Sequence, residues 1–485
     1  MQLQLSVRRK GSFMKTLNNQ NDRYIRMTTE PVSKLITSLA TPTIMSMLVS
    51  AFYNTADTYF VGKINTSATG AVGIVFSLMI IIQVVGIMIG VGSGSYIARL
   101  LGKRQADRAS RATSTAFFMV IAWGIGLTVL GEIFLDPFMR LLGSTETILP
   151  YAKSYGGIIL LGAPYMAASF VMNTNLRSEG NALLAMIGIV SGAVVNIILD
   201  PIFIFGFRMG IAGAATATII SQLISFLILL SHYIRRRSTL RIHPKNILFE
   251  KEMFREILGS GLPSFFRQSV AILAAIILNT CAGVYGDAAV AGMSVVNRII
   301  LFLGSALIGF GQGFQPVAAF NYAAGFGRRV YDAFWFAVKT GTVFLLIFST
   351  VACIFAPQII RLFRNDPEVI RIGALALRLQ CVTFPFSAFI VMSNMMFQYI
   401  GKPAKASLLA LSRQGLVFIP VIMILSQVLG LRGIQMSQAL SDGTTFLIAV
   451  PLTAGTLKVL KNPEPLHETG EIPGRGSLRD CTQNA

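Results

Sequence analysis

The chain has 485 residues, of which 53% are hydrophobic and 13% are charged, and it carries a formal net charge of +20. Soluble domains contain about 25% charged residues, so this composition excludes an ordinary soluble protein and predicts a membrane protein with many spans. Lys and Arg gather on the cytoplasmic loops of such proteins, so the positive charge reflects topology and no nucleic-acid partner is expected.

The two ends of the chain differ from its apolar middle. Residues 1–30 form a polar, basic tail without the apolar run of a secretory signal peptide, and Met1, Met14 and Met27 are alternative starts. Residues 461–485 are rich in Pro, Glu, Gly and Thr, a composition typical of disorder. The four cysteines form no CxxC pair, so neither a disulfide framework nor a metal centre is expected.

Runs of about 20 apolar residues, the length that crosses the hydrocarbon core, predict an all-α protein with twelve spans. In chain order they cover residues 35–61, 69–98, 112–135, 150–174, 183–207, 211–234, 257–283, 288–318, 333–360, 372–399, 406–429 and 434–458. The connections after the second and sixth spans are strongly basic, which places them and both termini in the cytoplasm. The connection after the ninth span opposes this orientation, because it carries Arg361, Arg364 and Arg371.

The two halves of the apolar region repeat each other. Pro42 is separated from Pro263 by the same length of chain that separates Gly180 from Gly401. This constant offset predicts two six-helix lobes, residues 31–234 and 257–460, joined by a basic cytoplasmic loop at 235–256. Because six spans return the chain to the same side, the repeats are expected to be parallel and related by an axis along the membrane normal, around a central cavity.

Glycines in the second span resemble a phosphate-binding loop only superficially. Gly86, Gly90 and Gly94 are spaced four apart in an apolar helix, so they share one face. A dinucleotide loop needs a preceding strand and a different spacing. We therefore predict that these glycines let neighbouring helices approach closely.

Two acidic residues lie inside apolar spans of the first lobe. Asp57 is about five residues from the outer end of the first span, and Asp200 about seven from the outer end of the fifth. With a rise of about 1.5 Å per residue, they lie within about 3 Å in depth, and Thr218 of the sixth span lies at a similar level. A charged carboxylate inside the membrane costs about 2.5–3.5 kcal/mol, so its presence indicates either a function or an interhelical hydrogen bond.

Local spacing strengthens the functional interpretation. Asn196 and Asp200 are four residues apart on one helix face, and Tyr53 and Asp57 have the same relation. Pro201 has no N–H, which frees a backbone carbonyl one turn earlier. Carboxylates, amides and carbonyls can take up a proton or bind Na⁺ at Asp57 and Asp200, and the residues leave H⁺ and Na⁺ both open.

The second lobe carries uncharged polar residues where the first has acids. Candidates for the lining of a substrate cavity are Gln268, Asn279, Gln312, Asn394 and Gln398, although most such residues serve as interhelical contacts. Arg298 and Asp442 receive no role. Glu179, expected in a cytoplasmic turn, is interpreted as a salt-bridge partner of Arg177.

Several motifs together resemble the multidrug and toxin extrusion (MATE) transporters, and in particular the bacterial branch typified by MepA. They are LATPTIMSMLVSAFYNTADTYFVG, SGSYIARLLGKRQADRA, LRSEGNA, NIILDPIFIF and GFGQGFQPVAAFNYAAG. The resemblance implies a cation-driven antiporter, not an enzyme, that exports diverse amphiphilic drugs from a bacterium through its inner membrane without a cofactor. It also implies a cation site at Asp57, Asn196 and Asp200, with Tyr53, Asn173 and Thr218 in the surrounding network.

Two other functions remain open at this point. A flippase for a lipid-linked precursor belongs to the same broad superfamily, but it should present a strongly basic cavity. An intramembrane aspartyl protease would need a GxGD motif, and AGVYGD at residues 282–287 only approaches it. The substrate cannot be identified from the sequence, and a monomer is expected.

Overall fold

The computed structural model describes residues 21–62, 66–248 and 250–461, apart from the side chains of residues 54–59, 62 and 66–69. Within these residues the regular elements are helices. They are α2 (Val32–Gly62), α3 (Thr66–Gly102), α4 (Ala106–Ile133), α5 (Leu135–Leu141), α6 (Leu149–Ser178), α7 (Ala182–Pro201), η1 (Ile202–Gly206), α8 (Gly210–Ile234), η2 (Pro244–Asn246), α9 (Lys251–Gly283), α10 (Asp287–Ala323), α11 (Gly327–Ile354), α12 (Ala356–Phe363), α13 (Pro367–Thr383), α14 (Phe386–Tyr399), α15 (Pro403–Leu411), η3 (Ser412–Leu416), α16 (Phe418–Val428) and α17 (Leu431–Lys461).

Eleven described helices are long and apolar enough to cross a membrane, and the bent pair α13–α14 makes a twelfth span. The prediction of an all-α membrane protein is therefore confirmed. The bounds of the predicted ninth span, 333–360, are wrong at both ends. The helix α11 begins earlier, at Gly327, and it ends at Ile354, where a separate helix, α12, follows. The predicted tenth span is bent by 57° near Pro385, where the missing N–H interrupts the helical hydrogen bonds.

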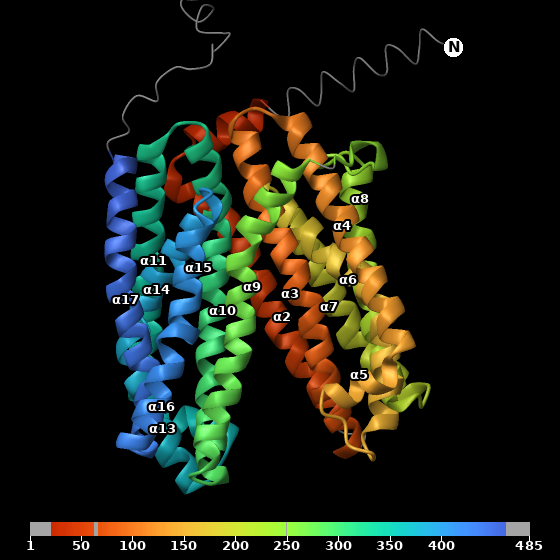
Figure 1. Cartoon of the computed structure of the whole chain (residues 1–485), viewed down its shortest axis with the longest axis vertical. Coiled ribbons are helices and arrows are strands. Elements are labelled where there is room, and N and C mark those ends of the chain that lie inside the picture. The colour runs from red at the N-terminus through yellow and green to blue at the C-terminus, as the bar shows by residue number, and fades with distance from the viewer. Residues whose placement is uncertain (1–20, 63–65, 249, 462–485) are drawn as a thin grey trace, which may run out of the picture.

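The helices form two groups. We use amino-terminal lobe for α2–α8 and carboxy-terminal lobe for α9–α17. The two lobes approach each other at the end of the bundle where the N-terminal residues lie, and they diverge toward the opposite end (Figure 1). We call these the N-terminal end and the far end.

Glycines let the lobes meet at the N-terminal end. A Cβ atom on Gly92 of α3 would collide with the carbonyl of Ile257 on α9. In the other pairing, a Cβ atom on Gly313 of α10 would lie 2.6 Å from the Cα of Ala40 on α2. Because Gly92 and Gly313 occupy equivalent positions of the sequence repeat, the same close contact occurs twice, once in each direction across the interface.

The glycines singled out in the second span also pack as predicted. Cβ atoms on Gly86, Gly90 and Gly94 would all meet residues of α6, between Ala167 and Ser178. The shared face therefore brings α3 and α6 together inside the amino-terminal lobe, and the interpretation as helix packing is confirmed.

Candidate functional site

Three of the predicted site residues lie together in the amino-terminal lobe. The amide nitrogen of Asn196 is 3.2 Å from Oδ1 of Asp200 on the same helix, α7, and 3.5 Å from the hydroxyl of Thr218 on α8. All three side chains are almost completely buried, at 1%, 0% and 0% exposure. The four-residue spacing of Asn196 and Asp200 and the packing of α7 on α8 create this cluster.

The cluster contains a buried acceptor that the described residues do not satisfy. Oδ1 of Asn196 is buried and accepts no hydrogen bond within the described part of the chain. Buried polar atoms are almost always hydrogen-bonded, so an exception indicates strain, a missing water or ion, or a function. An amide oxygen beside a carboxylate suits a small hard cation or a protonated group.

The helix changes its winding directly after Asp200. Pro201 ends α7, and residues Ile202–Gly206 form the π-helical turn η1. A proline removes one backbone donor and cannot continue regular hydrogen bonding. Single π-helical turns of this kind occur frequently at functional sites. The donor that Pro201 lacks therefore coincides with a change from α-helical to wider, π-helical winding.

Asp57 and Tyr53, the other predicted members, both belong to α2, which packs against α7. The side chain of Asp57 lies outside the described residues, so its meeting with Asp200 stays a prediction. Tyr53 is half-buried.

Asn173 makes a helix-to-helix contact near the start of α7, eleven residues before Asn196 and therefore away from this cluster. Its amide nitrogen donates to the carbonyl of Ala185 at 2.9 Å, which ties α6 to α7. Asn394, at the equivalent position of the sequence repeat, makes the matching bond from α14 to the carbonyl of Ala406 on α15 at 2.6 Å. Asn173 was predicted for the cation network and Asn394 for the substrate cavity. In the structure the two residues make equivalent helix-to-helix hydrogen bonds, one in each lobe.

The other candidates for the substrate cavity lie in three places: inside the carboxy-terminal lobe, at the lobe interface and on α9. The amide nitrogen of Gln398 donates to the carbonyl of Ser260 and to the hydroxyl of Ser264, both at 2.8 Å, inside the carboxy-terminal lobe. Gln312 accepts a hydrogen bond from Arg177 across the two lobes. On α9, Gln268 is half-buried and Asn279 is exposed.

An ion pair in the carboxy-terminal lobe was missed by the sequence analysis. Asp442 is completely buried, and its Oδ1 is 2.9 Å from Nε of Arg413, which lies in the π-helical turn η3. Gln438 donates to the same carboxylate oxygen at 3.1 Å, and Ser387 accepts from Arg413 at 3.0 Å. The acid in α17 was noted from the sequence, but it lies far along the chain from Arg413, and no local spacing connects them.

Two smaller expectations also have outcomes. Arg298 is exposed on α10, and the described contacts assign it no role. Glu179 does not pair with Arg177. Its carboxylate instead accepts from Ser238, Thr239 and Asn181 at 2.6–3.0 Å, because the connection after α8 folds over the turn between α6 and α7. Arg177 turns toward the carboxy-terminal lobe.

Comparison with known proteins agrees with this architecture. The sequence profile of the MatE family matches residues 42–202 and again 263–424, once in each lobe. The chain is 26% identical to the multidrug export protein MepA of Staphylococcus haemolyticus (strain JCSC1435) over 420 residues, covering 86% of this chain and 92% of that protein.

Solved structures show the same fold. One is a multidrug resistance MATE transporter of the MOP superfamily in an outward-facing conformation, with a TM-score of 0.85 and 26% identity, covering 90% of this chain and 98% of that one. Another, with the same values, is a MOP superfamily transporter from Pyrococcus furiosus Vc1 (DSM3638), whose binding pocket is described as reversed in polarity and as suggesting a different function.

Proposed function

The chain belongs to the MatE family of membrane transporters, and on that premise we propose that it is a cation-coupled exporter of diverse, often cationic, amphiphilic drugs. Membership of a transporter family leaves no place for the aspartyl protease considered from the sequence. The proposal extends to a multi-pass protein of the bacterial inner membrane with both termini in the cytoplasm, acting as a monomer.

The cluster of Asn196, Asp200 and Thr218 carries the proposal. A carboxylate at 0% exposure with an uncharged amide 3.2 Å away can hold a proton or a desolvated Na⁺. Oδ1 of Asn196, which accepts no hydrogen bond from the described residues, supplies a further oxygen. We propose that Asp57 joins this site from α2 together with Tyr53, and that Asn173 contributes by fixing the start of α7 to α6.

Coupling requires that the cation and the drug prefer different arrangements of the lobes. A ligand shifts a two-state equilibrium only through its different affinity for the two states. If the N-terminal end lies in the cytoplasm, as we propose, the divergence of the lobes toward the far end in Figure 1 corresponds to an outward-facing state. Cation entry at Asp200 would then favour release of the drug outside and the return of the lobes.

The flippase remains the second candidate, for a specific reason. Arg177 bridges the lobes through Gln312, and Arg413 is only partly buried, at 24% side-chain exposure, so positive charge does occur near the lobe interface and within the carboxy-terminal lobe. An anionic lipid-linked substrate would need such charge in the path that it follows. The buried carboxylate of Asp200 favours the drug exporter.

The test uses purified protein in vesicles with pH and Na⁺ gradients imposed separately. A fluorescent organic cation inside the vesicles should leave faster when one of these gradients points inward, and the effective gradient identifies the coupling ion. Protein-free vesicles and vesicles without any gradient are the controls. Efflux that ignores both gradients would contradict cation coupling, and movement of a fluorescent anionic lipid alone would favour the flippase.

A further inference from the structure

Residues 21–30 do not form a loose tail. Residues 21–29 are helical, Pro31 follows a break, and α2 begins at Val32. We call residues 21–30 the strap, because they lie across the N-terminal end and contact both lobes. From the sequence, residues 21–30 were expected to be part of the polar tail at residues 1–30.

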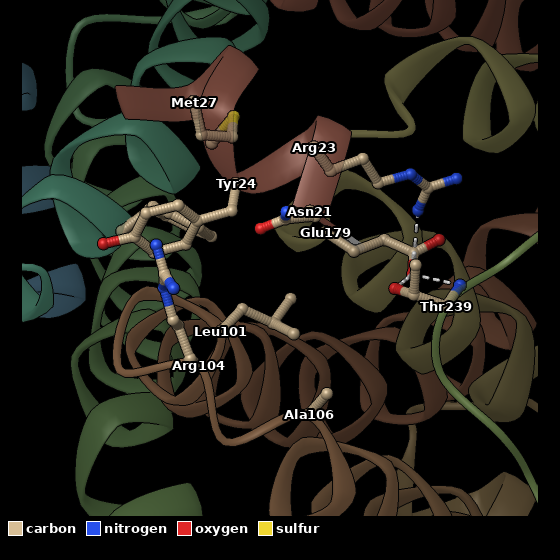
Figure 2. A pocket seen from close by; sticks show the side chains of 10 residues that line it. Asn21, Arg23, Tyr24, Met27, Leu101, Arg104, Ala106, Glu179 and Thr239 are labelled. Atoms are coloured by element: carbon tan, nitrogen blue, oxygen red, sulfur yellow. Dashed lines mark hydrogen bonds and ion pairs between the residues drawn. The ribbon is translucent and has the colours of Figure 1, made fainter. Parts of the chain in front are cut away.

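Charged contacts attach the strap to the amino-terminal lobe. The guanidinium of Arg23 is 3.5 Å from the carboxylate of Glu179 and donates to the carbonyl of Arg237 at 3.1 Å (Figure 2). The guanidinium of Arg104 lies 4.1 Å from the centre of the Tyr24 ring, a favourable cation–π distance. Arg23 of the strap and Arg104 of the amino-terminal lobe therefore fix the start of the strap on this lobe.

Residues of the amino-terminal lobe hold the Glu179 side chain in place independently of the strap. Its side chain is completely buried, and Ser238, Thr239 and Asn181 already donate to its carboxylate. The amino-terminal lobe thus presents a preorganised negative site to Arg23. Removing Arg23 would leave the carboxylate hydrogen-bonded, so the docking site does not depend on the strap.

Contacts of a different kind join the strap to the carboxy-terminal lobe. Asn321 donates to the carbonyl of Met27 at 3.1 Å, and Arg329 donates to the carbonyl of Glu30 at 2.7 Å. The rings of Tyr24 and Phe320 are 5.5 Å apart. The strap also inserts the buried side chain of Met27 into the hydrophobic core that contains Phe320. Its attachment to this lobe is therefore apolar and through backbone carbonyls, and no strap side chain forms an ion pair with this lobe within the described residues.

A cavity of about 280 Å³ lies beneath the strap. It is lined from the amino-terminal lobe by Leu101, Arg104 and Ala106 (Figure 2). From the carboxy-terminal lobe it is lined by Phe320. This pocket is open to the surface, so the described side chains of the strap do not fill the junction between the two lobes at this point. A junction that is not filled can separate without leaving a tight core exposed.

We propose that the strap is a latch: it stays on the amino-terminal lobe through Arg23 and Glu179, holds the lobes closed at the N-terminal end, and releases Asn321 and Arg329 when the lobes part there. The latch rests on the proposed function, because only alternating access requires this end to open. A strap bound to both lobes would block the opening.

Cross-linking in vesicles tests this. In a chain whose four cysteines are replaced by Ser, a Tyr24→Cys, Phe320→Cys pair is bridged with a bifunctional methanethiosulfonate reagent. The reagent forms a disulfide with each cysteine, which a reductant cleaves, and it ties the strap to the carboxy-terminal lobe. The matched control is Asn21→Cys with Ala106→Cys, which ties it to the amino-terminal lobe. We expect the first bridge to abolish efflux reversibly on reduction, and the second to leave efflux at the unbridged rate.

Two results would overturn the latch. Either efflux continues with the strap bridged to the carboxy-terminal lobe, or both bridges stop it equally. Failure of the proposed function is recognised separately, because the unbridged, reduced protein would then already fail to couple efflux to a cation gradient.

A second measurement does not depend on transport. Spin labels on exposed Asn21 are paired either with exposed Asp332 of the carboxy-terminal lobe or with exposed Arg111 of the amino-terminal lobe. The latch predicts two separated distance populations for the first pair and one for the second. A single population for both pairs contradicts it.

Discussion

Each lobe buries an aspartate beside a π-helical turn, but the surroundings of the two carboxylates differ. Asp442 is neutralised from within by Arg413, which lies in η3 and sits 2.9 Å away. Asp200, directly before Pro201 and η1, receives a hydrogen bond from the uncharged amide of Asn196. The guanidinium of Arg413 already balances the charge of Asp442, so this carboxylate has little left to offer an external cation. For this reason our proposal places cation coupling at Asp200 of the amino-terminal lobe.

The largest expected effect comes from removing the charge at Asp200. Asp200→Asn keeps an acceptor for Asn196 but can no longer take up a cation, so coupled efflux should fall to the level of protein-free vesicles. Asp57→Asn should behave alike. The measurement is efflux of a fluorescent cation alongside the melting temperature in detergent. Asp136→Asn, at a surface ion pair with Lys153, is the control and should transport normally. Normal efflux by Asp200→Asn would refute the proposal that Asp200 binds the coupling cation.

Breaking the ion pair of the other lobe should instead affect stability. Arg413→Gln leaves Asp442 buried without its counter-ion, and because Arg413 is 24% exposed we expect a loss of about 2–4 kcal/mol, less than for a fully buried pair. The double variant with Asp442→Asn should recover much of it. Thermal melting measures both, and gradient-dependent efflux should persist. If Arg413→Gln instead uncouples transport, both Asp200 and Asp442 take part in cation coupling.

Asn196→Ala should weaken coupling without abolishing it. It removes a hydrogen bond to a charged group, worth about 1.5–3 kcal/mol, so we expect roughly a tenfold or greater rise in the cation concentration that half-activates efflux. The carboxylate of Asp200 remains and can still exchange its cation. An unchanged half-activating concentration would remove the amide from the site.

The smallest effect separates a structural role from a functional one. Asn173→Ala and Asn394→Ala each delete an equivalent bond to a backbone carbonyl, so each should lower stability by about 1 kcal/mol. Equal losses with unchanged cation dependence would show that both residues only join helices. A shift in the cation dependence of Asn173→Ala alone would place it in the cation network.

The fold was largely predictable because the length and apolar composition of a membrane span can be recognised in the sequence. The bend near Pro385 carried a readable signal, since proline cannot continue helical hydrogen bonding, but the unbroken apolar run concealed it. The strap was missed for the opposite reason. Its helix is held by tertiary contacts with Glu179, Asn321 and Arg329, not by an apolar run of its own.

The site was predictable where its members share one helix. Asn196 and Asp200 are four residues apart, so the helical repeat alone joins them, and Thr218 was found by comparing depths. Arg413 and Asp442 lie on different helices with no common local pattern. Their meeting depends on how α17 packs against η3, which the sequence does not specify.

The glycine contacts between the lobes have a kinetic consequence. Where Gly92 lies against Ile257 and Gly313 against Ala40, backbone touches backbone, and no long side chain interlocks at these points. A glycine has no side chain to withdraw, so these two contacts themselves add little friction when the lobes part. The activation barrier for exchanging the two states would then be governed by the few polar bonds around them, such as those between Arg177 and Gln312 and between Arg99 and Glu256.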